Sequence, residues 1–326
     1  MKGFGFNRSE ILRQYGILFV LIAMFIIFSV ATPNFLKVEN LFNVARQVSM
    51  MGIAAVGMMF VMIAGGIDIS IGSLLSFVNV FCAFLIVNFN VHPLWASLAA
   101  VAVASVGGFL NGVIVTQMKV PPLISTLAFM TIWEGIAFLI SRGMTIFGLP
   151  DTFRTLGSGY VGPIPIPVII MVVFLAFGGF FLNKTYIGRY FYAVGGNEEA
   201  AGLSGIHVRK LKWLVYTLCA AFTAVAGLVM LARLNAGAAT TGKGFEFQVI
   251  TAVVLGGVSI AGGTGRMFGV IIGILIMGFL SNGMVLLDVS EYVQRIIQGV
   301  VLVLAVGFDC LSKDIGMDKK GVLKSE

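Results

Sequence analysis

The sequence predicts an all-α integral membrane protein with about ten membrane-spanning helices. Of its 326 residues, 59% are hydrophobic and only 11% are charged, and the mean hydropathy is +1.03. Soluble domains carry about 25% charged residues. The apolar residues form long continuous runs, without the alternation that the strands of a closed barrel require. Lysine and arginine are also unequally shared between the two sets of loops that such helices would connect.

Runs of roughly 18 apolar residues cross a bilayer as helices, and ten candidates follow one another along the chain. They cover approximately residues 15–31, 48–64, 70–88, 93–117, 121–141, 166–182, 213–233, 247–263, 267–287 and 292–310. Because no linker or low-complexity segment divides them, we expect residues 1–326 to form a single transmembrane domain.

An even number of spans places both termini on the same side of the membrane. If that side is the cytoplasm, fourteen lysines and arginines lie inside and seven outside, which accounts for all 21. This asymmetry follows the positive-inside rule. We therefore expect a multi-pass membrane protein with cytoplasmic termini, and the net charge of +7 requires no nucleic-acid partner.

The N-terminal segment fits two interpretations. Lys2, Arg8 and Arg13 precede an apolar core, and Ser29-Val30-Ala31 has the small-x-small pattern of a signal-peptide cleavage site. Multispan proteins commonly keep such a segment as an uncleaved first span, and we expect that residues 1–31 are kept. The three cysteines, Cys82, Cys219 and Cys310, have no metal or redox spacing, so we expect small buried side chains and no metal site.

Two further segments differ from the spans. Residues 37–48 carry apolar side chains at helical spacing among charged and amide residues, which predicts an amphipathic helix lying in the outer interface. Residues 142–165 form the longest outer loop, and either a lid or docking surface or a simple connector fits their composition.

The most polar part of the chain is residues 183–212, named here the polar loop. It contains five lysines and arginines between two long apolar runs. Gly195-Gly196-Asn197 indicates a turn, and Asn197 is suited to cap a helix whose first turn holds Glu198 and Glu199. We therefore expect a short helix at the membrane surface on the basic side, where a partner protein binds it.

The sequence contains no complete motif for nucleotide binding or catalysis. Gly237–Gly244 is close to a nucleotide-binding P-loop, but Gly244 replaces the required hydroxyl residue, no strand precedes it, and the topology places it outside. The chain has only two histidines and no hydrolase or zinc-protease motif. We therefore expect no enzyme activity, no ATPase machinery and no cofactor.

Polar side chains within the spans give candidates for a translocation pathway. Asp68 fits either a buried pathway or gate residue or a cap of the next helix. Glu134 fits either a polar pathway or hydrogen bonding between helices. Neutral polar groups beside aromatic rings suit an uncharged polyhydroxyl solute and suit interhelical contacts nearly as well. The candidates are Asp68, Asn79, Asn111, Trp133, Glu134 and Asn282.

Three motifs resemble one family, the ribose-type (carbohydrate uptake 2) permeases of bacterial ABC sugar importers. They are Gly-Gly-Ile-Asp-Ile-Ser-Ile-Gly-Ser at 65–73, Tyr-Ala-Val-Gly-Gly-Asn at 192–197 with the Ala-Ala-x-Leu-Ser-Gly-Ile that follows at 200–206, and Gly-Gly-Val-Ser-Ile-x-Gly-Gly-x-Gly at 256–265. The resemblance extends from about residue 15 to 312.

The resemblance implies a type II ABC importer-like permease fold in the bacterial inner membrane. It also implies three partners for a monosaccharide importer: a cytoplasmic ABC ATPase, a periplasmic sugar-binding protein and a second permease chain, identical or different. Glu199-Ala200-Ala201-x-x-x-Gly205 is similar to the family motif that docks on the ATPase, although Leu214-Val215 stands where Leu-Pro often follows. The implied ATPase-coupling residues are Gly195, Asn197, Glu198, Glu199, Ala200, Ala201 and Gly205.

Three rival functions follow from the same residues. A proton-coupled secondary transporter of a small polar solute would use Asp68 or Glu134 to carry the proton. A permease for autoinducer-2 would share the family motifs, because the same family serves that solute. An intramembrane enzyme is the third, although the chain lacks a motif for it. Sensitivity of transport to vanadate, which traps ABC ATPases, separates the importer from the symporter.

Overall fold

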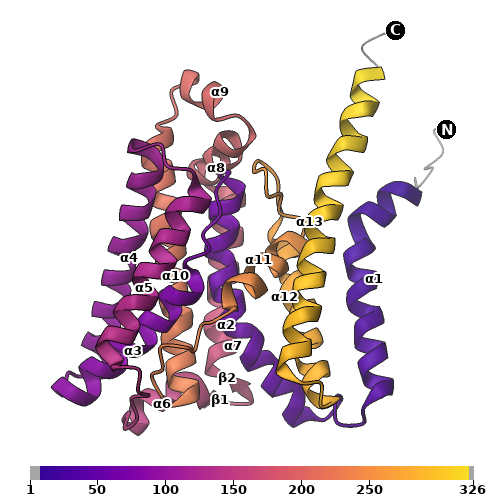
Figure 1. The fold of residues 1–326 in the computed structure, drawn as a ribbon. Helices are drawn as coiled ribbons and strands as arrows, with labels where there is room; N and C mark the ends of the chain where they lie inside the picture. Colours follow the sequence, from indigo (N-terminus) through magenta and orange to yellow (C-terminus); the bar gives the residue numbers. More distant parts are fainter. Residues whose placement is uncertain (1–7, 323–326) are drawn as a thin grey trace.

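The structure is a computed structural model that describes the backbone of residues 8–322 and the side chains of residues 16–310. It is almost entirely helical, as Figure 1 shows. The helices before the polar loop are α1 Arg8–Ala31, α2 Val38–Ile63, α3 Ile71–Phe89, α4 Pro93–Gln117, α5 Pro122–Ser141, α6 Asp151–Ser158 and α7 Ile166–Lys184. The others are α8 Tyr186–Gly196, α9 Glu198–Leu203, α10 Val208–Leu234, α11 Phe245–Leu255, α12 Met267–Leu286 and α13 Glu291–Val322.

Eight of these helices are long and apolar enough to cross a membrane, which confirms the fold class within the described residues. Two of the ten expected spans correspond to shorter apolar helices, Gly16–Ala31 and Phe245–Leu255. The continuous span expected over 247–263 is wrong, because α11 ends at Leu255 and an irregular loop of residues 256–266 follows.

The two ends of the molecule differ. One end carries α8 and α9, together with the beginning of α1 and the end of α13; the opposite end carries α6 and a short hairpin (Figure 1). The hairpin pairs β1 Tyr160–Val161 with β2 Ile164–Pro165. We call these ends the α9 side and the α6 side.

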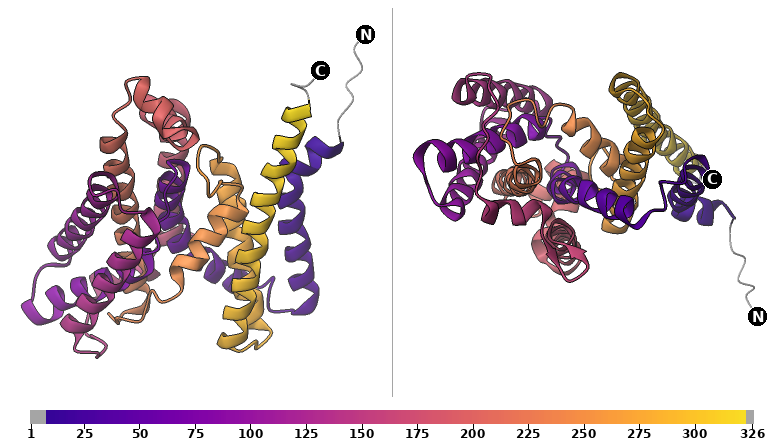
Figure 2. Two further views of the ribbon diagram at one scale, coloured as in Figure 1. Left: turned by 45° about the horizontal axis from the view of Figure 1, so that its top comes forward. Right: turned by 90° about the horizontal axis from the view of Figure 1, so that it is seen from below.

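Helices α2 and α10 form the centre of the fold. α10 packs against α4, α2 and α3, and every residue of α2 from Val48 to Ile63 is buried. A helix that is apolar on all sides lies either in a protein core or in lipid, and α2 is in the core. Five buried methionines lie on this segment, at positions 50, 51, 58, 59 and 62. Seen from the α6 side, α3, α4 and α5 lie on one flank, and α1, α12 and α13 on the other (Figure 2).

Residues 37–48 do not form a separate interfacial helix. They are continuous with α2, because their apolar residues pack inward: Val44 and Val48 are buried. Their polar residues bind α12, since Asn40 and Asn282 exchange two hydrogen bonds of 2.9 Å and the Gln47 amide donates to Ser281 Oγ at 3.1 Å. The segment therefore fixes the start of α2 to α12.

Residues 142–165 form an ordered cap that contains α6 and the hairpin. Gly157 of α6 packs directly on the backbone of Ala232 and Arg233, at the end of α10. Ile146 pairs with Gly237 through two backbone hydrogen bonds of 2.9 Å. The cap therefore holds the α6-side end of α10 and the start of the segment that follows it.

Residues 235–244, part of which the topology places outside, pack against the membrane helices instead of forming a free loop. This segment runs along α3, with Gly237 against Asn79 and Ala83, and Gly242 against Gly72. The backbone N–H of Gly242 donates to the buried Ser76 Oγ at 2.8 Å. Irregular backbone is tolerated at membrane depth where protein surrounds it or it lines a cavity. This segment and α11 therefore make one interrupted crossing.

Candidate functional site

The polar loop folds into α8, α9 and the first turn of α10. The predicted helix cap is confirmed, because the Asn197 side chain accepts a 2.9 Å hydrogen bond from the Ala200 N–H. Glu198 and Glu199 occupy the first turn of α9, where carboxylates suit the positive end of a helix. The second helix of the loop, α8, was not expected.

The surface of α9 is exposed and chemically mixed. Leu203 at its end is 86% exposed, and Gly205 terminates the turn with φ +86°. Lys212 forms an ion pair with Glu198, which holds α9 against α10. Arg209 and Lys210 are exposed in the first turn of α10, where the helix dipole disfavours cations. The surface therefore offers an apolar tip beside two cations that an acidic partner would stabilise.

The polar loop is joined to the membrane core through four glycines, named here the glycine junction: Gly65, Gly195, Gly262 and Gly263. Gly195 packs on the Ile63 carbonyl at the end of α2, and that carbonyl accepts a 2.9 Å hydrogen bond from the Gly263 N–H. A Cβ on Gly262 would lie 2.8 Å from the Gly195 oxygen and 2.9 Å from the Gly65 Cα. Only residues without side chains allow this approach.

Tyr192 of α8 adds a side-chain connection to the same place. Its hydroxyl donates a 2.9 Å hydrogen bond to the Gly265 carbonyl. Burial raises the pKa of Tyr192, and the nearby Arg266 opposes that change, so the phenol stays protonated as a donor at neutral pH. The three motifs that carry the family resemblance thus meet in space, which their spacing in the sequence did not indicate.

Asp68 lies in the loop that leads from the glycine junction to α3, and it is 1% exposed. Its Oδ1 accepts hydrogen bonds from the Ser70 N–H at 2.9 Å and from Ser70 Oγ at 2.6 Å. This geometry stabilises the turn before α3. The hydroxyl of Tyr216 lies nearby, buried against Gly66 without a hydrogen-bond partner in the described part of the chain. The role of Asp68 in a pathway stays a prediction.

Four of the other pathway candidates are buried between pairs of helices. Asn79 donates to the Gly227 carbonyl of α10 at 2.8 Å, and Asn111 accepts from Ser125 Oγ at 2.5 Å. Trp133 lies against Phe77, with ring centroids 4.6 Å apart. Asn282 is the partner of Asn40. These residues lie in different helix interfaces and do not converge on one site.

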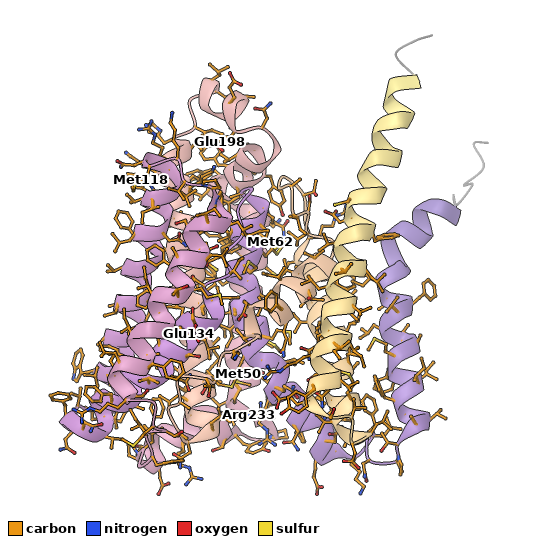
Figure 3. All side chains as sticks on the ribbon, viewed as in Figure 1. Met50, Met62, Met118, Glu134, Glu198 and Arg233 are labelled. Carbon is orange, nitrogen blue, oxygen red and sulfur yellow. The ribbon has the colours of Figure 1, made fainter. Side chains whose placement is uncertain are left out.

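Glu134 behaves differently from its neighbour Trp133. Trp133 is buried against α3, whereas Glu134 is exposed on another face of α5. Figure 3 shows Glu134 at mid-height, between Met118 toward the α9 side and Arg233 toward the α6 side. A second carboxylate, Glu246, is buried at the start of α11 and was not among the expected site residues. A carboxylate directly before the expected span 247–263 was the signal in the sequence that could have identified it.

The chain is similar to bacterial sugar permeases over most of its length. The ribose import permease protein RbsC of Escherichia coli (strain K12) is 42% identical over 93% of this chain and 95% of that protein. RbsC of Bacillus subtilis (strain 168) is 40% identical over 92% and 93%. The L-arabinose transport system permease protein AraH of Escherichia coli (strain K12) is 38% identical over 93% and 92%. No solved structure matches the chain.

The family comparison covers both the polar loop and the glycine junction. Residues 40–306 match the family described as branched-chain amino acid transport system / permease component. That range spans α2 to α12 and most of the apolar part of α13. The resemblance to ribose-type permeases is therefore confirmed, and the chain belongs to this family of transport permease components.

Proposed function

We propose that the chain is the membrane-spanning permease subunit of an ATP-driven importer for a monosaccharide such as ribose or allose. The names of the relatives, which include ribose and L-arabinose permeases, support a small neutral sugar. In this proposal a periplasmic binding protein delivers the sugar, a second permease chain completes the pathway, and a cytoplasmic ABC ATPase supplies the energy. The permease itself carries out no chemical reaction.

The observation that carries the proposal is the exposed tip of the polar loop. Leu203 is the most exposed large apolar side chain among the described residues, at 86%, and it lies on a helix capped by Asn197 and tied to α10 by Glu198 and Lys212. A rigidly held apolar tip with basic neighbours suits a groove on a partner with an acidic rim. We assign this partner as the ATPase, with the sequence-predicted coupling residues around the tip.

Leu203→Glu is expected to uncouple the importer. Burial of a leucine side chain contributes about 1.5–3 kcal/mol, so its loss weakens ATPase binding about tenfold or more. Co-purification of the ATPase and sugar uptake should both fall, while the permease stays in the membrane. Leu203→Met is the matched control and should retain both. If Leu203→Glu shows normal sugar uptake and normal co-purification of the ATPase, Leu203 does not dock on the ATPase.

Orientation gives an independent test. In a variant with Cys82, Cys219 and Cys310 replaced by alanine, Ala200→Cys on α9 should react with an impermeant thiol reagent only after the membrane is opened. Thr155→Cys on α6, also exposed, should react in intact cells from which the outer barrier has been removed. The reverse pattern would place the polar loop outside and contradict its role as a cytoplasmic dock.

A further inference from the structure

A group of polar side chains lies at membrane depth on α5, on α13 and on the interrupted crossing that contains α11, and we name it the polar face. Figures 1 and 2 show α11 between α5 and α13. The Gln248 amide of α11 donates to Gln298 Oε1 of α13 at 3.4 Å. Glu134 is exposed on α5, and Lys243 is exposed in the segment that leads into α11. The polar face consists of Thr131, Glu134, Lys243, Glu246, Gln248 and Gln298.

The depth of this face follows from the helices that carry it. Glu134 lies seven residues before the α6-side end of α5, and Gln298 lies seven residues after the start of α13 on that same side. At ~1.5 Å per residue both are about 10 Å from their helix ends, well inside a hydrocarbon core ~30 Å thick. Figure 3 places Glu134 at a matching mid-height.

Lipid does not provide a stable environment for the polar face. A charged residue at the bilayer centre costs about 2.5–3.5 kcal/mol on insertion scales, and Glu134 and Lys243 are both exposed. Helix α7 gives the contrast, because its exposed residues between Ile166 and Phe180 are all apolar: Val172, Val173, Ala176, Phe177 and Phe180. α7 has a surface suited to lipid, whereas the polar face requires water or polar groups.

The residues of the polar face differ in the contacts that they make. The Glu246 carboxylate is buried against Gly72 of α3, so it holds the interrupted start of α11 on α3. Glu134 makes no hydrogen bond within the described residues. Gln298 holds Gln248 through a long contact. Phe247, which is 50% exposed, lies beside them in the sequence.

We infer that the polar face lines the sugar pathway, with Glu134 and Gln298 contacting the passing sugar. This inference rests on the proposed function, in which the second permease chain closes the open side. A carboxylate and an amide bind hydroxyl groups through several donors and acceptors, and an exposed aromatic ring stacks on the apolar face of a sugar. The 3.4 Å contact between Gln248 and Gln298 is long for a hydrogen bond, which leaves Gln298 free to exchange partners as the sugar moves.

Thiol labelling tests the environment without requiring transport. In the cysteine-free variant, Glu134→Cys and Gln298→Cys should react with a small hydrophilic thiol reagent, because the reactive thiolate forms only in water. Val173→Cys, seven residues from the α6-side end of α7, is the depth-matched control and should stay unreactive. Unreactive cysteines at both 134 and 298 would overturn the inference, whatever the transporter imports.

Sugar protection then tests the contact itself. In the assembled importer, the sugar that the wild type imports should slow labelling at 134 and 298. Unchanged labelling in an importer active for that sugar would reject the sugar contact. Failure of the wild type to import any monosaccharide would reject the proposed function instead, so the two failures are distinguishable.

Substitutions at Glu134 add a transport measurement. Glu134→Gln keeps the size and one acceptor oxygen, so uptake should fall less than in a variant that removes both polar atoms. Glu134→Leu inserts readily into a membrane but cannot bind hydroxyl groups, and uptake should fall about tenfold. Equal uptake by the leucine variant and the wild type would contradict a contact at this position.

Discussion

Gly195→Ala is expected to abolish sugar uptake, whereas Gly196→Ala should leave it close to wild type. A Cβ on Gly195 would collide with the Ile63 carbonyl and lie 2.6 Å from the Gly263 nitrogen, while a Cβ on Gly196 would have no neighbour within 4 Å. The first change therefore separates α8 from the end of α2 and strains the Gly263–Ile63 hydrogen bond. Uptake and ATPase turnover should be measured with the same membrane level of each variant.

A milder variant separates coupling from folding. Tyr192→Phe removes the hydrogen bond to the Gly265 carbonyl without adding volume, so the protein should still insert and fold. A hydrogen bond contributes about 0.5–1.5 kcal/mol, and we expect reduced uptake at normal ATPase binding. Wild-type transport in both Gly195→Ala and Tyr192→Phe would mean that the glycine junction transmits no movement.

Collapse of the proton gradient should leave uptake intact as long as cellular ATP is clamped, and vanadate should stop it. A symporter requires a carboxylate that changes protonation in each cycle. The Asp68 carboxylate is buried and accepts two hydrogen bonds from Ser70, so a proton on Oδ1 would disturb the turn before α3. Transport driven by ATP hydrolysis in a partner protein does not require a carboxylate to change protonation.

Asp68→Asn tests the same point, because it removes the carboxylate that a symporter would protonate. It keeps the acceptor oxygen for Ser70, so the turn and substantial transport should survive. Measurements in cells with clamped ATP and in vesicles loaded with ATP would check each condition separately. If uptake stops when the proton gradient collapses at constant ATP, the ATP-driven importer is contradicted and the proton symporter is supported.

Hydropathy predicted most of the fold because membrane helices must be apolar over a fixed length. It failed at α11, because the loop after Leu255 is also apolar: Val258, Ile260 and Ala261 sit among glycines, and an averaged window does not show where the helix ends. It also did not show the packing of residues 235–244, since a glycine-rich segment packed along α3 has the composition of an exposed loop.

The candidate site was predictable only where its contacts are local. The Asn197 cap joins two residues that are three positions apart in the sequence, so the local sequence pattern alone identified it. The glycine junction joins residues near 65, 195 and 262, and one sequence does not reveal contacts over such separations. Trp133 and Glu134 are adjacent, yet one is buried and the other exposed, because the direction of each side chain depends on which helices surround α5.

The five buried methionines of α2 affect how the protein changes shape. Methionine has three rotatable bonds and no branch, so it fills irregular space in many nearly equivalent ways. A core of branched side chains would resist displacement of its central helix, because each shift would open voids. Around α2, side-chain rotation refills such voids, and we expect inward-open and outward-open arrangements to differ little in packing energy.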